Sequence, residues 1–171
     1  KHAKPLIIFI IAFMILASIH PASNDNSSSG AVQAQTTSEE YVFRRSWGYR
    51  GSGSIQLNYP HGIAINNKGK IFITDTVSDR IQKCSSEGLI LAKWGVEGNN
   101  PGTFQNPVGI AVDDNDMVYI ADTENNRIQK FDSNGTFISQ WGTKGHNPGD
   151  FNEPWGIAVD KEGYVYVSDT F

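Results

Sequence analysis

The sequence is poor in the residues on which several kinds of site depend. Its 171 residues include one cysteine, Cys84, and four histidines. A single cysteine excludes a disulfide within these residues, and it also excludes a Cys-x-x-Cys metal or redox motif. No P-loop, nucleophile elbow or His-Glu-x-x-His motif occurs either. The motifs of the common phosphate-binding and hydrolytic enzymes are therefore missing, and we expect no cofactor.

Basic residues are also scarce. Lysine and arginine number 14 against 18 aspartates and glutamates, which gives a formal net charge of −4. Because binding to nucleic acid requires a basic patch that neutralises phosphates, we expect no nucleic-acid partner. No window repeats its apolar residues with the 3.6-residue period of a helix, which excludes a helical solenoid.

The only long apolar run lies near the N-terminus, where Lys1 and Lys4 precede residues 6–19. Such a run would form a helix of about 21 Å, which is shorter than a bilayer core of about 30 Å. A positive flank followed by a short apolar run is typical of a secretory signal. Residues 1–22 are therefore predicted to be a signal peptide or an uncleaved signal-anchor. The remainder is expected to be secreted or anchored at the cell surface, with membrane contact only through this segment.

Residues 23–40 are rich in serine and asparagine and contain few apolar side chains. A segment of this composition cannot bury a core, so it is predicted to be a flexible linker.

The rest of the chain repeats with a fixed period. Trp-Gly occurs at Trp47, Trp94 and Trp141, with a spacing of 47 residues. Three further sets keep this spacing, namely Pro60, Pro107 and Pro154, Gly62, Gly109 and Gly156, and Asp75, Asp122 and Asp169. A constant period of this length indicates a repeat architecture.

The second repeat predicts four strands, at residues 109–113, 117–122, 127–131 and 137–141, because each segment is rich in β-branched or aromatic residues. Asn134-Gly135 between the last two is typical of a type I′ hairpin turn. Four short strands joined by tight turns and repeated at a constant period predict an all-β fold of four-stranded antiparallel β-propeller blades.

The string PVGIAVDDNDMVYIADT, followed by NNRIQKFDSNGTFISQWG, resembles the NHL repeat. The resemblance covers residues 41–171 and implies a β-propeller, commonly of six blades, of which about two and a half would be present. Its parts are an orphan closing strand at 41–50, repeats at 51–97 and 98–144, and a partial repeat at 145–171. Because the chain stops within the third repeat, we interpret it as a fragment. Cys84 stands at the position of Phe131 and is expected to pack as a small buried hydrophobic residue.

Two charged pairs keep the period, Asp75 with Arg80 and Asp122 with Arg127. We interpret them as structural ion pairs of the loop between the second and third strands. The alternative is a ligand-facing acid–base pair, but catalytic groups are seldom copied into every blade.

Other positions break the period and are better candidates for a binding site. His61, Val108 and Trp155 occupy one repeat position, directly before the first strand of each repeat. In a propeller this position opens on the central channel. The resemblance also extends to peptide-amidating lyases, which build a metal site from channel-mouth histidines. Here only one of the three positions is a histidine, and a tetrahedral zinc site needs three or four ligands, so no metal site is predicted.

Residues 113–116 form an acidic run, Asp-Asp-Asn-Asp. The run lacks the glycine and the distal glutamate of an EF-hand calcium loop, so we interpret it as a turn.

The favoured function is that of an exported, non-enzymatic binding scaffold for a protein or another macromolecule. The alternative is a channel-mouth lyase or hydrolase that resembles the peptide-amidating lyases, with its site completed by further blades.

Overall fold

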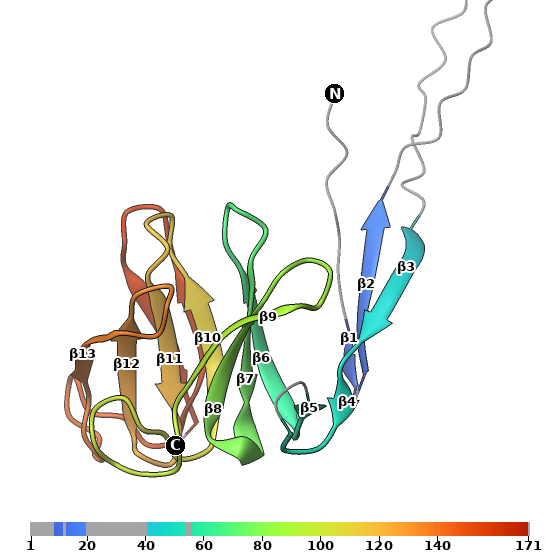
Figure 1. The fold of residues 1–171 in the computed structure, drawn as a ribbon. Coiled ribbons are helices and arrows are strands. Elements are labelled where there is room, and N and C mark those ends of the chain that lie inside the picture. Colours follow the sequence, from blue (N-terminus) through green and yellow to red (C-terminus); the bar gives the residue numbers. More distant parts are fainter. Residues whose placement is uncertain (1–8, 12, 20–40, 54–55, 171) are drawn as a thin grey trace, which may run out of the picture. The chain divides into compact units, whose positions relative to one another are not determined.

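The computed structural model describes residues 9–11, 13–19, 41–53 and 56–170. The chain divides into two compact units, residues 1–47 and 48–171. In the first unit three strands form an antiparallel sheet in the order β1-β2-β3 (Figure 1). Their bounds are Phe9–Ile11 for β1, Phe13–Ile19 for β2 and Tyr41–Trp47 for β3.

The prediction of a helix for the N-terminal apolar run is wrong for the described residues of that run, which form β1 and β2. The run is rich in isoleucine, whose branched side chain favours a strand, and pairing with β3 satisfies the backbone of β2. Among the residues that the structure describes, no helix is long and apolar enough to span a membrane. The predicted linker, residues 23–40, lies outside the described residues.

The second unit contains two four-stranded antiparallel sheets, followed by a two-stranded antiparallel sheet that begins a third blade (Figure 1). The first blade consists of β6 (Pro60–Ile65), β7 (Ile71–Asp75), β8 (Arg80–Cys84) and β9 (Ile90–Trp94), with a short 3-10 helix, η1 (Thr76–Ser78), after β7. The second consists of β10 (Pro107–Val112), β11 (Val118–Asp122), β12 (Arg127–Phe131) and β13 (Phe137–Trp141). The two strands of the third blade are β14 (Pro154–Val159) and β15 (Val165–Asp169). The predicted four-stranded antiparallel blades are confirmed.

A loop precedes each blade and is closed by parallel pairing between its two ends. Before the first blade the pairing joins β4 (Tyr49–Arg50) to β5 (Gln56–Leu57). The equivalent bridges are Glu97 to Phe104 and Lys144 to Phe151. The three loops therefore repeat with the same period as the blades.

The first strands of successive blades pack against one another, β6 against β10 and β10 against β14. A Cβ atom on Gly62 would lie 2.3 Å from the carbonyl oxygen of Val108, and one on Gly109 would lie 2.3 Å from that of Trp155. The repeated glycine therefore allows the backbones of two neighbouring blades to approach closely.

The core lies between the two complete blades. Its fully buried side chains include Phe72 and Ile81 of the first blade and Ile120 and Phe131 of the second, with Phe104 from the loop between them. Cys84 is also fully buried, as expected, and burial raises the pKa of its thiol to about 12. A thiol in this state is an inert packing group.

The predicted type I′ turn is wrong. Of its residues Gly135 has a positive φ of 91°, whereas Asn134 does not. The carboxylate of Asp132 accepts hydrogen bonds from the backbone N–H groups of Asn134 and Thr136, both at 2.8 Å. These bonds favour a type I turn followed by one left-handed residue, which is the other common hairpin connection.

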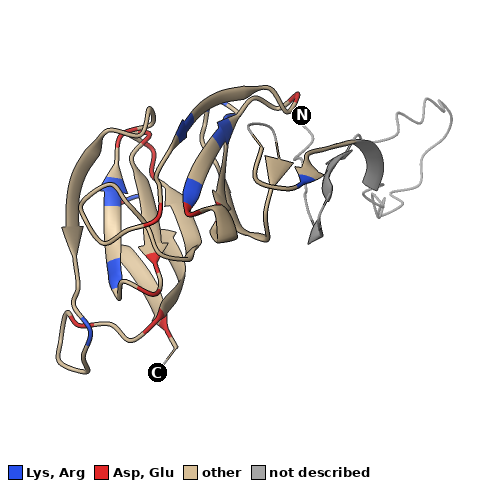
Figure 2. Cartoon of the chain, turned by 60° about the horizontal axis from the view of Figure 1, so that its bottom comes forward, with Lys and Arg blue, Asp and Glu red and all other residues tan. Residues whose placement is uncertain are grey.

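The acidic run 113–116 forms the equivalent turn between β10 and β11, as expected. The Asp113 carboxylate accepts from the N–H groups of Asn115 and Met117, and Asp116 adopts a positive φ of 64°. Acidic residues are found mostly in such loops and at strand ends, whereas several basic residues lie within β8, β9 and β12 (Figure 2).

Candidate functional site

The two charged pairs that keep the period form ion pairs across neighbouring strands. Arg80 and Asp75 face each other on β8 and β7, and Arg127 and Asp122 do so on β12 and β11. The distance from the arginine Nε to the aspartate Oδ2 is 2.7 Å in both pairs. Both aspartates are completely buried.

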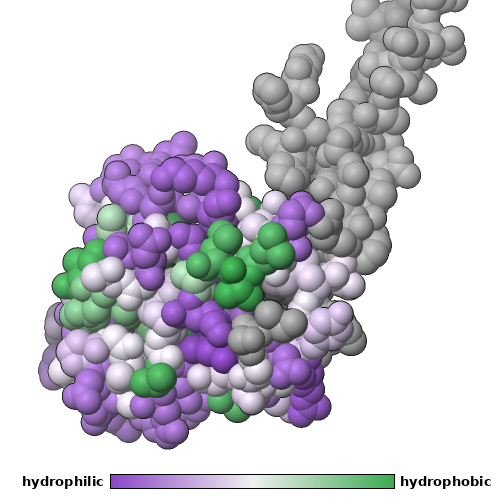
Figure 3. Space-filling model, viewed as in Figure 1, coloured by the Kyte–Doolittle hydropathy of each residue, from purple (hydrophilic) through white to green (hydrophobic). Residues whose placement is uncertain are grey.

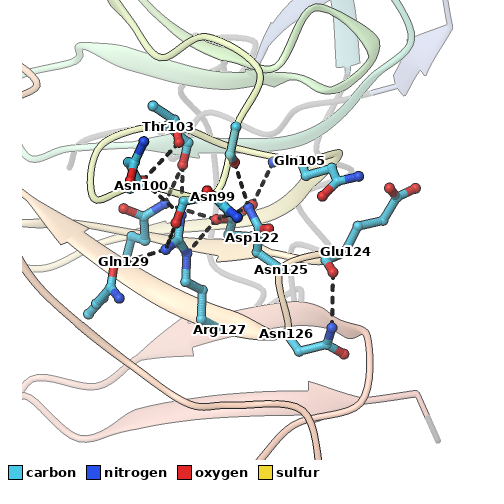
Figure 4. Close-up of polar contacts among 12 residues, drawn as sticks. Asn99, Asn100, Thr103, Gln105, Asp122, Glu124, Asn125, Asn126, Arg127 and Gln129 are labelled. Atoms are coloured by element: carbon cyan, nitrogen blue, oxygen red, sulfur yellow. Dashed lines mark hydrogen bonds and ion pairs between the residues drawn. The ribbon is translucent and has the colours of Figure 1, made fainter.

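Each arginine also holds the loop that precedes its own blade. Arg127 donates from Nη1 to the carbonyl oxygen of Asn99 at 2.7 Å, and from Nη2 to those of Asn100 and Thr103, both at 3.0 Å (Figure 4). Arg80 donates in the same way to the carbonyl oxygens of Ser52, Gly53 and Gln56.

The buried aspartate collects further donors around the same loop. Asp122 accepts from the backbone N–H of Gln105 at 2.8 Å and from the side-chain amide of Gln129 at 2.9 Å (Figure 4). Burial raises the pKa of Asp122, and the hydrogen bonds from Gln105, Asn125 and Arg127 oppose this shift. The arginine fork is occupied by the aspartate and the loop, so the geometry is that of a structural tie.

The three residues that break the period line one pocket. His61, Val108 and Trp155 share a cavity of about 440 Å³, together with Tyr59 and Val77 among others. Trp155 is 48% exposed, whereas Val108 is 5% exposed. The structure therefore brings together side chains that lie 47 residues apart in the sequence, with Trp155 reaching the surface.

A repeated backbone conformation places these side chains. The residue before each repeated proline, Tyr59, Asn106 or Glu153, has a positive φ of 51°, 49° or 60°. The chain therefore turns in the same way before β6, β10 and β14. The backbone repeats, whereas the side chains at this position and two residues later differ between repeats.

Hydrogen bonds between neighbouring repeats fix one side of the pocket. The Thr76 hydroxyl donates to the carbonyl oxygen of Pro107 at 2.7 Å, and the Thr123 hydroxyl donates to that of Pro154 at 2.8 Å. The side chains of Thr76 and Thr123 are buried and line the pocket. The pocket is therefore built on a rigid frame rather than on a free loop.

The same bonds determine the hydrogen-bonding state of His61. Its Nδ1 lies 3.0 Å from Thr76 Oγ1, whose proton is given to Pro107. We therefore assign the proton of this contact to His61 Nδ1, and in this tautomer Nε2 is an acceptor. Nε2 has no hydrogen-bond partner among the described residues. The His61 and Trp155 rings meet edge to face, with centroids 5.8 Å apart.

Two carboxylates complete the lining, Glu124 and Glu153. One Glu124 oxygen accepts a hydrogen bond from the side-chain amide of Asn106. The Glu153 carboxylate has no side-chain partner in the described part of the chain, and both side chains are exposed. Lysine and arginine are missing from the described lining.

Within the described ranges, no group of three or more histidine, cysteine, aspartate or glutamate residues could hold a metal ion. The pocket residues as described thus offer an aromatic surface and hydrogen-bond acceptors.

Sequence reasoning missed Tyr59, Glu124 and Glu153. Tyr59 and Glu153 share a repeat position with Asn106, and Glu124 shares one with Val77. A search for period-breaking residues one position before the repeated proline, and two positions after the repeated aspartate, would have found them.

Comparison with known proteins supports the repeat architecture. Residues 57–84 and 104–131 match the family model of the NHL repeat. No curated protein sequence matches the chain.

Solved structures that are similar to the chain include the following two. Hydrazine synthase from Kuenenia stuttgartiensis has a TM-score of 0.54 and 16% identity, and the match covers 67% of this chain and 30% of that chain. The gluconolactonase XC5397 from Xanthomonas campestris has a TM-score of 0.49 and 19% identity, with coverage of 67% and 36%. The chain thus spans about a third of the length of either protein, and at 16% identity the likeness to hydrazine synthase extends to the fold alone.

Proposed function

Because the chain carries NHL repeats, we propose that it is a binding module of a β-propeller and has no catalytic role of its own. Its ligand is a protein or another macromolecule, held at the pocket formed by His61, Val108 and Trp155. The observation that carries this proposal is the convergence of the three period-breaking side chains on one cavity.

The exposure of the pocket's apolar side chains supports recognition. Tyr59 is 58% exposed and Trp155 is 48% exposed, and both line the cavity. Large aromatic residues at the rim of a pocket are typical anchors of protein interfaces, because they bury much area with few rotatable bonds.

The charged pairs that repeat in both blades do not compete for this role. Arg80 donates to Asp75, and Arg127 donates to Asp122. Both arginines also donate to carbonyl oxygens of the loops. Their hydrogen-bonding capacity is spent inside the fold, which supports a separation between scaffold residues and ligand-contacting residues.

A binding selection tests the proposal. Peptides selected from a random library against the full chain should bind Trp155→Ala at least about tenfold more weakly, as expected for an aromatic anchor. Tyr164→Ala is the matched control, because Tyr164 is 68% exposed and does not line the pocket. Peptides that bind the Trp155→Ala variant as well as the original chain would contradict the proposal.

The fate of the selected peptides separates binding from catalysis. We expect them to be recovered unchanged by mass spectrometry after prolonged incubation with the chain. Cleavage or elimination at a defined bond would instead favour the lyase or hydrolase alternative.

We also propose that the chain is exported, since two lysines precede its apolar N-terminal run. Residues 1–40 fused to a reporter that is active only outside the cytoplasm should yield active reporter. An inactive fusion, with the reporter present in the cytoplasm, would contradict export.

A further inference from the structure

The pocket's lining combines aromatic rings with hydrogen-bond acceptors and negative charge. We propose that it receives a basic side chain, lysine or arginine, from a protein partner. The inference rests on the proposed binding function and specifies the chemistry that the pocket selects.

The charge of the lining is the first argument. Glu153 has a carboxylate without a side-chain partner in the described ranges, and Glu124 has one oxygen engaged by Asn106. His61 adds a third acceptor, since its Nδ1 is used by Thr76 and its Nε2 is left with a lone pair. An anionic group in this cavity would meet two carboxylates, whereas an ammonium or guanidinium group would find acceptors for its N–H donors.

The aromatic rings are the second argument. A cation is attracted to the face of tryptophan or tyrosine by the negative charge density of the ring. Tyr59 already makes such a contact, because the Arg50 guanidinium carbon lies 5.3 Å from its ring centroid. Arg50 also donates to the Tyr59 hydroxyl at 3.3 Å, so this rim residue binds a guanidinium within the chain itself.

The position of Trp155 extends this surface toward the carboxylates. Trp155 follows Glu153 by two residues and lies in β14, and both residues line the cavity. Its ring meets His61 at an interplanar angle of 82°, so the two rings form a corner rather than a stack. Trp155 thus adds an aromatic ring beside the His61 imidazole in the lining of the pocket.

The size of the cavity suits this occupant. A volume of about 440 Å³ lies within the range of about 300–1,000 Å³ that is usual for ligand sites. A lysine or arginine side chain can enter such a space while the flanking peptide lies across the exposed rings of Tyr59 and Trp155. The pocket would then supply charge selectivity, and the rim would supply contact area.

The composition of the selected peptides tests the proposal directly. Peptides that depend on Trp155 should carry lysine or arginine at one fixed position. Replacement of that residue by citrulline, which keeps the shape of arginine without its charge, should weaken binding by at least about tenfold, as loss of a charged hydrogen bond predicts.

A substitution in the protein provides the second arm. Glu153→Gln should weaken binding of the basic peptide by at least about fivefold, because it removes the carboxylate that has no other partner. Glu162→Gln is the matched control, since it makes the same change of charge at another exposed position of the third repeat that does not line the cavity. Binding should be unchanged in this control.

The outcomes separate the two proposals. Selected peptides that require Trp155 but contain no fixed basic residue would overturn the charge selectivity and leave the binding function intact. Equal affinity of Glu153→Gln and the original chain for the basic peptides would also overturn it. Peptides that bind without any dependence on Trp155 would contradict the binding site itself.

Discussion

The first and second blades share a backbone and a period but differ in how well their polar groups are paired. In the second blade the Asn125 amide donates to Asp122 at 2.9 Å and to the carbonyl oxygen of Gly98 at 2.8 Å. The first blade has Ser78 at this position, and its hydroxyl is buried with no hydrogen-bond partner among the residues that the structure describes. The side chain at this position thus adds a hydrogen bond to the preceding loop in the second blade that Ser78 does not make in the first.

The arginine of the second blade is also more buried and has more hydrogen-bond partners among the described residues than the arginine of the first. The Arg127 side chain is 7% exposed and also donates to Gln140 at 3.1 Å. The Arg80 side chain is 15% exposed, and the position of Gln140 is taken by Lys93, which offers no acceptor. The second blade therefore has the more complete set of hydrogen bonds. The first blade shows which of these bonds are missing from an otherwise equivalent fold.

The surfaces of the blades differ as well. In the first blade Ile65 and Leu89 are exposed apolar residues, whereas in the second blade Val112, at the position of Ile65, is half-buried and Thr136 stands at the position of Leu89. Figure 3 shows apolar patches on this face of the molecule, separated by hydrophilic areas. The second blade has a neighbour on each side, since β10 packs against both β6 and β14.

The largest difference between the blades is expected from removal of the arginines. Arg127→Ala leaves Asp122 buried without its cation and removes the arginine's hydrogen bonds to three loop carbonyl oxygens, which should lower the free energy of unfolding by about 3–5 kcal/mol. Arg80→Ala should cause a smaller loss, because Arg80 is more exposed and has fewer partners. Chemical denaturation of the full chain measures both values.

A conservative variant keeps this test informative if Arg127→Ala does not fold. Arg127→Lys preserves the charge but cannot reproduce the fork, so it should retain only part of the stability. An equal or larger loss for Arg80→Ala than for Arg127→Ala would contradict the ranking of the two ties.

The next effect is expected at the unpaired serine. Ser78→Asn should raise the stability of the chain by about 1 kcal/mol, because the amide can reach Asp75 and the loop as Asn125 does in the second blade. The reverse change, Asn125→Ser, should lower stability by a similar amount. If Ser78→Asn is neutral or destabilising in thermal denaturation, the two loops are not equivalent.

The smallest effect concerns Asp79, which stands where the second blade has Asn126. Asp79 accepts a hydrogen bond from the N–H of Asn106 at 2.8 Å, as Asn126 does from that of Glu153. Burial raises the pKa of the Asp79 carboxyl, with further contributions from Glu97, Glu124 and Asp122. Ionisation of Asp79 therefore opposes folding, and its cost is absent below the ordinary pKa and grows as the pH rises through the raised value.

Asp79→Asn should consequently raise the melting temperature at neutral pH and have no effect near pH 3. The gain in the free energy of unfolding at neutral pH should be below about 1 kcal/mol. Melting curves across this pH range measure the difference. A gain that is constant with pH would show that the charge of Asp79 is not its cause.

The fold of the second unit could be predicted because its sequence repeats. Residues that keep the period mark the same strand ends in successive repeats, as Asp122 and Arg127 do in the second and Asp75 and Arg80 in the first. The turn type of the hairpin at Asn134-Gly135 was predicted wrongly, because the hydrogen bonds to the Asp132 carboxylate outweigh the preference of Asn-Gly for a type I′ turn. A propensity for one dipeptide does not include acceptors elsewhere in the turn.

The strands β1 and β2 and part of the pocket escaped prediction for different reasons. A short apolar run rich in isoleucine fits a helix and a buried strand equally well, and only pairing with β3 distinguishes them. Glu124 and Glu153 are ordinary surface residues in the sequence, and their shared pocket depends on the close approach of neighbouring repeats. The signal of Trp155 was its departure from the period at a position that the fold repeats.

The central claim is that the repeated ion pairs hold the fold, whereas the period-breaking residues of the pocket are proposed to contact the ligand. The most direct test measures peptide affinity and melting temperature together for Trp155→Ala and Arg80→Ala. We expect Trp155→Ala to reduce affinity by at least about tenfold with little change in melting temperature, and Arg80→Ala to lower the melting temperature while the folded protein binds normally. Loss of stability without loss of affinity in Trp155→Ala would contradict the claim.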